Sequence, residues 1–97
     1  MARSVLAMEL IPAIRELLGE LEGERSAVVT GRRAALWRAQ QQAAILHHTL
    51  DDLRRYCLES LAPRRGLEES DYLRGYREGF QAVLSEVRRI EAQGRGS

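Results

Sequence analysis

The chain has 97 residues, a formal net charge of +1, 44% hydrophobic residues and 30% charged residues, which limits it to one domain and excludes a disordered chain. It has no Lys, which excludes a Walker A phosphate loop and a Schiff-base enzyme, and its single Cys excludes an internal disulfide.

The first predicted helix covers residues about 4–23. Leu and Ile recur through it every three or four residues, which is the spacing of one helix face. Ser4 is a suitable N-cap, and Pro12 either begins the helix or kinks it. Gly23 and its polar neighbours predict a turn, after which Ser26 or Thr30 caps the next helix.

The second predicted helix is long and covers residues about 26–61. Its apolar positions are out of phase with those of the first helix by one residue, which favours a turn over one continuous helix from Pro12 to Leu61. The apolar stripe consists of Leu36, Ala39, Ala43, Leu46, Leu50, Leu53 and Cys57.

The third predicted helix covers residues about 68–92 and carries a matching stripe from Leu73 to Ile90. A short connector with Pro and Gly separates it from the second helix, so the two helices are predicted to pack antiparallel. Gly75 and Gly79 lie inside this helix and cost about 2 kcal/mol of helix propensity together. We therefore predict that another helix packs closely against these two glycines.

These elements predict an all-α fold: a long antiparallel helical hairpin with the N-terminal helix packed on it, as a three-helix or dimeric coiled-coil-like bundle. Residues 1–93 form a single helical domain, and residues 94–97 form a flexible tail. We expect a homodimer, because the stripes and the small residues beside them offer more apolar surface than one hairpin covers.

The segment from Tyr72 to Phe80, with its two glycines, resembles the Gly-xxx-Gly helical repeats of flagellar and type III export stator proteins. The remainder of the chain lacks that family's length and C-terminal domain. The same segment also resembles the Tyr/Gly-rich helix of many small phage-encoded helical proteins, which suggests a phage origin.

Trp37 belongs to a second row on another face of the second helix, together with Ala34, Gln41 and Ala44. We expect the first helix to fold over this row and bury Trp37, because a lone Trp in a small domain is usually core. The alternative is an exposed Trp37 between Arg33 and Arg38, which is a typical composition for a protein interface.

No metal site or cofactor site is predicted. His47 and His48 are adjacent and point about 100° apart on a helix, so they cannot hold one metal together. Each has an Asp four residues later, which favours salt-linked surface pairs. Cys57 is predicted to be a small core residue.

The sequence predicts a non-enzymatic protein-interaction module, an adaptor or inhibitor that binds a larger protein through Trp37, Arg33 and Arg38. Arg64 and Arg65, in the connector, are predicted to form a second contact. The alternative is a nucleic-acid-binding accessory protein that uses the acid-free segment 25–50 and the same connector. We find no signal peptide and no membrane span, and we expect a cytoplasmic protein.

Overall fold

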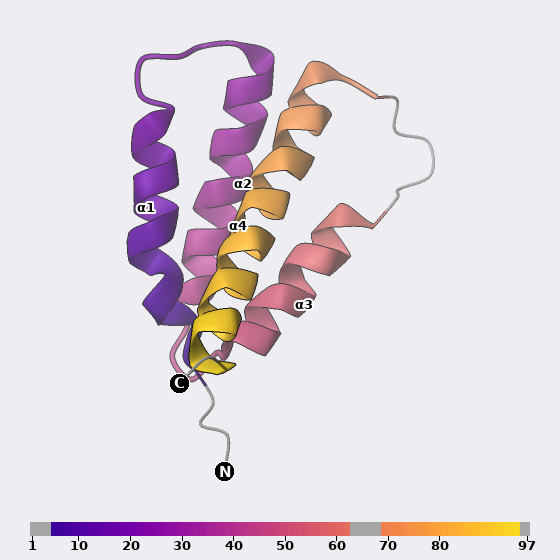
Figure 1. The fold of residues 1–97 in the computed structure, drawn as a ribbon. Coiled ribbons are helices and arrows are strands. Elements are labelled where there is room, and N and C mark those ends of the chain that lie inside the picture. Colours follow the sequence, from indigo (N-terminus) through magenta and orange to yellow (C-terminus); the bar gives the residue numbers. More distant parts are fainter. Residues whose placement is uncertain (1–4, 63–68, 96–97) are drawn as a thin grey trace.

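The computed structural model describes residues 5–62 and 69–95, and over these residues the fold is an all-α bundle (Figure 1). A short 3-10 helix, η1, precedes four α-helices. Their bounds are η1 Ala7–Leu10, α1 Ile11–Glu20, α2 Ala27–Ala43, α3 Leu50–Leu61 and α4 Asp71–Arg95. Ser4, the expected first cap, lies outside the described residues.

The predicted turn between the first and second helices is present. Gly23 has a φ of +85°, a conformation that glycine adopts without steric cost. Ser26 is the N-cap of α2, and its Oγ accepts a hydrogen bond from the amide of Val29 at 3.2 Å. One continuous helix from Pro12 to Leu61 is therefore wrong.

The prediction of a single helix over residues 26–61 is also wrong, because α2 ends at Ala43 and α3 begins at Leu50. His47 has a φ of +73° in the turn between them. Thr49 and Asp52 form a capping box: each side chain accepts a hydrogen bond from the other residue's amide, at 3.2 and 2.9 Å. Leu46, predicted as core, is in this turn with 70% of its surface exposed.

The break at residues 44–49 reverses the chain, so that α2 and α4 run in the same direction (Figure 1). Their contacts show this, because α2 residues with higher numbers meet α4 residues with higher numbers: Gly75 lies against Val28, and Gly79 lies against Ala35. Of the two helices that replace the predicted second helix, only α3 is antiparallel to α4 (Figure 1). The predicted long hairpin is thus reduced to α3 and α4, while α2 packs parallel to α4.

Glycines make the contact between α2 and α4 unusually close. A Cβ at Gly75 would overlap the carbonyl oxygen of Val28, and a Cβ at Gly31 would overlap that of Tyr72. At Gly79 a Cβ would lie 2.7 Å from the Cβ of Ala35. The backbones of the two helices are therefore in contact, and no side chain larger than hydrogen fits at these three positions.

The core forms where α3 and α4 meet α2. Phe80 is fully buried, and its ring contacts Tyr56 of α3 edge-on with the centroids 5.8 Å apart. Arg54 of α3 pairs with Glu91 of α4. On the other side of α2, α1 buries Ile14 completely.

Two backbone hydrogen bonds tie the start of the described chain to the turn between α2 and α3. The amide of Ala7 donates to the carbonyl of His48 at 2.8 Å, and the amide of Leu50 donates to the carbonyl of Val5 at 2.9 Å. These two bonds hold the N-terminal end of η1 beside the N-terminal end of α3.

The helix α4 starts and ends slightly later than predicted. The Ser70 hydroxyl accepts a hydrogen bond from the amide of Leu73 at 3.1 Å just before its first turn. Its last residue is Arg95, so Gly94 and Arg95, predicted to be in a flexible tail, are helical. Across residues 5–62 and 69–95, no helix is both long and apolar enough to cross a membrane.

Candidate functional site

Trp37 is exposed, contrary to the expectation that the first helix buries it. Of its surface, 51% is accessible. It lies on the face of α2 that points away from α4, and on this face Gln41 and Ala44 are exposed as well. The helix α1 packs beside this face rather than over it, so the row around Trp37 stays uncovered in the single chain.

A hollow of about 410 Å³ lies next to Trp37, between α1 and α2. Apolar, small and charged side chains share its wall. The residues that line it are Arg15, Leu18, Gly19, Glu22, Arg33, Trp37 and Gln40. It can therefore accept a side chain or a helix edge from another molecule.

Arg33 is fixed in this hollow by the end of α1. Its Nη2 donates to the carbonyl of Leu21 at 2.9 Å and to the carbonyl of Glu24 at 3.1 Å. These carbonyls follow the last turn of α1, where a cation is favourable because the helix dipole is negative there. Arg33 thus holds the turn between α1 and α2 while it stands beside Trp37.

Arg38 points in another direction and does not line the hollow. Its guanidinium carbon lies 5.7 Å from the ring centroid of Tyr76 in α4, within the range of a cation–π contact. The predicted trio is therefore divided: Trp37 and Arg33 share the hollow, and Arg38 lies over α4.

The acid-free segment 25–50 uses much of its positive charge inside the fold. Arg32 forms an ion pair with Glu78 of α4, Arg33 binds carbonyl oxygens, and Arg38 lies over Tyr76. Fewer free cations are thus offered to phosphates than the sequence suggested. The predicted second contact, Arg64 and Arg65, lies outside the described residues.

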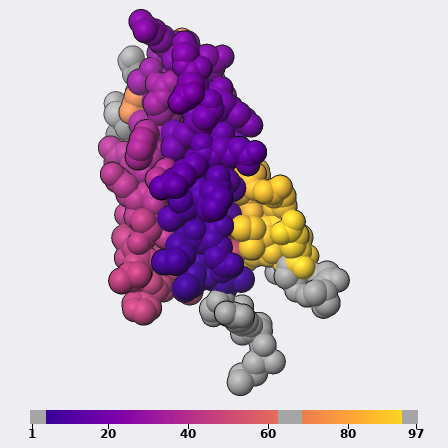
Figure 2. Space-filling view, turned by 90° about the vertical axis from the view of Figure 1, so that its left-hand side faces the viewer, coloured from indigo at the N-terminus to yellow at the C-terminus, as the bar shows by residue number. Residues whose placement is uncertain are grey.

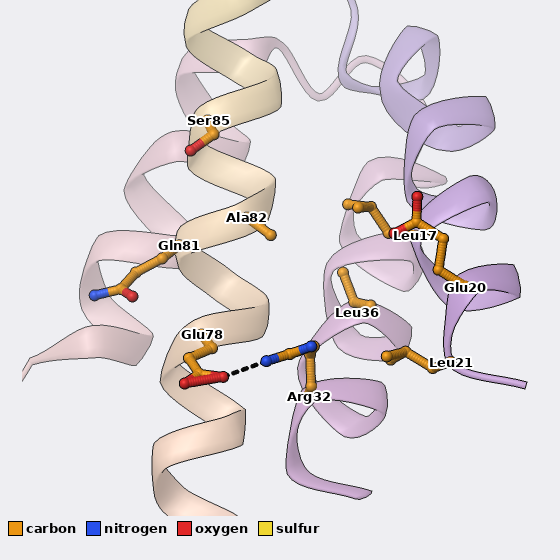
Figure 3. A pocket seen from close by; sticks show the side chains of 9 residues that line it. All are labelled: Leu17, Glu20, Leu21, Arg32, Leu36, Glu78, Gln81, Ala82 and Ser85. Carbon is orange, nitrogen blue, oxygen red and sulfur yellow. Dashed lines mark hydrogen bonds and ion pairs between the residues drawn. The ribbon is translucent and has the colours of Figure 1, made fainter. Parts of the chain in front are cut away.

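A second hollow of about 430 Å³ lies on the other side of α1, between α1 and α4 (Figure 3). Leu36 of α2 forms its floor, and the ion pair between Arg32 and Glu78 crosses one end. Gly75 and Gly79 line neither hollow, because both are buried at the contact with α2. The helix α1 thus has open space along both of its edges.

The titratable groups discussed next lie away from Trp37 and are buried, hydrogen-bonded or ion-paired within the fold. Burial raises the pKa of the Cys57 thiol to about 12, so this thiol is inert at neutral pH. The backbone amide of Thr49 lowers the pKa of Asp52 below its ordinary value of 3.8. Asp51 pairs with Arg54 and Arg55. Within the described ranges, no three His, Cys, Asp or Glu side chains are grouped so that they could hold a metal ion.

No protein-family model, curated protein or solved structure matches this chain. Any function of the surface around Trp37 must therefore be inferred from its own geometry.

The α1 side of the hollow was not identified from the sequence. Arg15, Gly19 and Glu22 are spaced by four and three residues, which is the spacing of one helix face, although α1 ends at Glu20 and Glu22 lies in the turn after it. That spacing was masked by the stronger apolar stripe of the same helix. The four- and three-residue spacing of these polar and small residues is the signal in the sequence that indicates them.

Proposed function

We propose that this chain is a non-enzymatic protein-interaction module, an adaptor or inhibitor that binds a larger protein through the exposed face of α2. The observation that carries this proposal is the 51% exposure of Trp37 beside a hollow. Trp is enriched among the residues that dominate binding energy in protein interfaces, where it fills or borders a pocket.

The chemistry of the face supports a protein partner. Trp37, Gln41 and Ala44 are exposed on it, and no carboxylate occurs anywhere between residues 25 and 50. Covering an apolar and amide surface costs less free energy of desolvation than covering a surface of carboxylates, provided that the partner hydrogen-bonds to the amides. Arg38 lies over Tyr76 but is itself exposed, so it favours a partner with a carboxylate on the side of this face toward α4.

The hollow supports the same proposal, because its wall is held in place before binding. Arg33 is fixed by two carbonyl groups, so less side-chain entropy is lost on binding. A partner side chain placed in the hollow would contact Trp37 and the outer edge of α1 together. We retain Arg64 and Arg65 as a proposed second contact.

Capture from cells with matched variants tests the proposal. We expect wild type and Leu58→Ala to retain the same protein, and Trp37→Ala to lose it at least tenfold. Leu58 is the control because it is 52% exposed, much like Trp37, but on α3. The interaction is then measured with purified components by calorimetry.

Equal retention by both variants would reject the Trp37 face. Retention of nucleic acid instead, with affinity that falls steeply with salt and is lost in Arg64→Ala/Arg65→Ala, would favour the nucleic-acid alternative.

A further inference from the structure

One edge of α1 is only partly covered by its own chain: Leu18 packs in part against the core, whereas Arg15 and Gly19 are exposed. Figure 2 shows α1 as the outermost ridge of this side of the molecule. Arg15, Leu18, Gly19 and Glu22 follow one another along the edge of this ridge that borders the Trp37 hollow. They are spaced by three, one and three residues and form one strip, which starts on α1 with Arg15, Leu18 and Gly19 and ends at Glu22 in the turn directly after the helix.

Gly19 differs from Gly31, Gly75 and Gly79 in the space around it. At Gly31, Gly75 and Gly79 a Cβ would collide with the neighbouring helix, whereas at Gly19 it would meet nothing within 4 Å. Gly19 also needs no special backbone angle, because the positive φ of this region belongs to Gly23. Inside one chain, a glycine at this position only weakens the helix.

The charges on the strip are arranged with opposite signs at its two ends. Arg15 lies at one end and Glu22 at the other, with Leu18 and Gly19 between them. Both charged residues are exposed. In the part of the chain that the structure describes, neither of them forms an ion pair.

We propose that this strip binds a second copy of the chain, with the two α1 helices antiparallel around a two-fold axis between Leu18 and Gly19. With this axis the strip is complementary to itself: residue 15 of one copy faces residue 22 of the other, and residue 18 faces residue 19. Each Arg15 meets Glu22 of the partner subunit, and each Leu18 packs over Gly19 of the partner subunit. A two-fold interface requires this kind of matching surface.

Two further features fit this arrangement. The missing side chain at Gly19 lets the helices approach closely, as glycines do between α2 and α4 of the same molecule. Trp37 lines the same hollow as Gly19, so its side chain would cover one side of the contact between the two α1 helices. Arg15, Gly19 and Glu22, which the single chain leaves exposed, are thus residues that a second copy would contact.

The helix is short, and this sets the expected strength. The ten residues of α1 span about 15 Å, so the interface lies at the small end of specific interfaces. We expect a dissociation constant on the order of 10 µM. The inference goes beyond the proposed function, because it concerns self-association through α1; since both use the hollow beside Trp37, a second copy would compete with a partner bound there.

Sedimentation equilibrium of the purified full chain, from about 1 to 500 µM, tests the proposal. We expect wild type to dimerise and Gly19→Ala to dimerise at least tenfold more weakly. We expect Gly19→Ala also to melt at a higher temperature, because Ala favours the helix and has room there. Weaker association in a more stable protein separates the interface from a folding defect.

Charge reversal gives a second, independent test. Arg15→Glu and Glu22→Arg should each be monomeric, because each places like charges opposite one another. A mixture of these two variants should form a heterodimer, and the double variant Arg15→Glu/Glu22→Arg should dimerise again. Glu20→Arg is the control: it changes the charge equally but lines the hollow on the α4 side of α1.

A wild type that is monomeric up to 500 µM would overturn the proposal. So would dimerisation that is unchanged by Gly19→Ala and Glu22→Arg. Either result leaves the capture experiment on Trp37 to be judged separately, since that experiment depends on a different protein.

Discussion

The two sides of α2 differ in how closely a neighbouring helix packs. On one side, α4 lies backbone to backbone against α2, and three glycines are required there. On the other side, α1 leaves hollows along both of its edges, and Gly19 has empty space around it. Glycine thus allows close packing between α2 and α4, whereas in α1 it leaves open space at the surface.

Gly75→Ala and Gly19→Ala should change stability in opposite directions. The new Cβ at Gly75 overlaps a backbone carbonyl that cannot move away without shifting α2. We expect a loss of about 3 kcal/mol in the free energy of unfolding. Gly19→Ala should gain up to about 1 kcal/mol, because only helix propensity changes. Urea denaturation measures both.

Equal effects of these two substitutions would break the comparison. Gly79→Ala provides a graded control, because its nearest atoms, the Cβ of Ala35 and the carbonyl oxygen of Arg32, would lie at 2.7 and 2.8 Å, whereas the Val28 oxygen would overlap the new Cβ at Gly75 far more deeply. We expect its loss of stability to be smaller than that of Gly75→Ala.

Arg33→Ala should loosen the open side alone. It removes two hydrogen bonds to the carbonyls of Leu21 and Glu24, for which we expect a loss of about 1 kcal/mol. Amide hydrogen exchange should quicken in the last turn of α1 and remain unchanged in α4. Arg38→Ala is the matched control, since Arg38 contacts Tyr76 instead. Faster exchange in α4 for Arg33→Ala would contradict this assignment.

The smallest effect concerns pH and the turn that reverses the chain. The Thr49 amide lowers the pKa of Asp52, so the ionised carboxylate stabilises the fold above its ordinary pKa of 3.8. This contribution is lost as the pH falls through the lower value of the folded protein. We expect the free energy of unfolding of wild type to exceed that of Asp52→Asn at pH 7, and the two values to become equal as the pH falls to 2. A difference between the two proteins that persists at pH 2 would show that the charge of the carboxylate is not its cause.

Much of the all-α fold could be predicted from the sequence, because apolar spacing and capping residues act locally. The turn after the first helix was predicted from Gly23 and Ser26, and both act there as expected. The end of α2 was not predicted. Thr49 and Asp52 match the sequence pattern of a capping box, but His47 and His48 pair equally well with Asp51 and Asp52 along a continuous helix.

This single error changed the direction of packing. Continuous spacing carried the apolar stripe through Leu46, so the whole segment was expected to run antiparallel to the last helix. The buried set Leu36, Leu50 and Leu53 was predicted correctly, because burial follows helix periodicity whichever way the helix runs. The exposure of Trp37 depends on where α1 crosses α2, which no local pattern determines.

The parallel contact between α2 and α4 also determines when the protein can become stable during synthesis. Arg32 and Glu78 are 46 residues apart, so the glycine- and alanine-lined face of α2 has no cover until most of the chain has been made. Contacts at this sequence separation form slowly. For that interval α2 exposes a surface prone to aggregation, so a ribosome-bound chain stalled before α4 should bind chaperones, and release of the complete chain should end that binding.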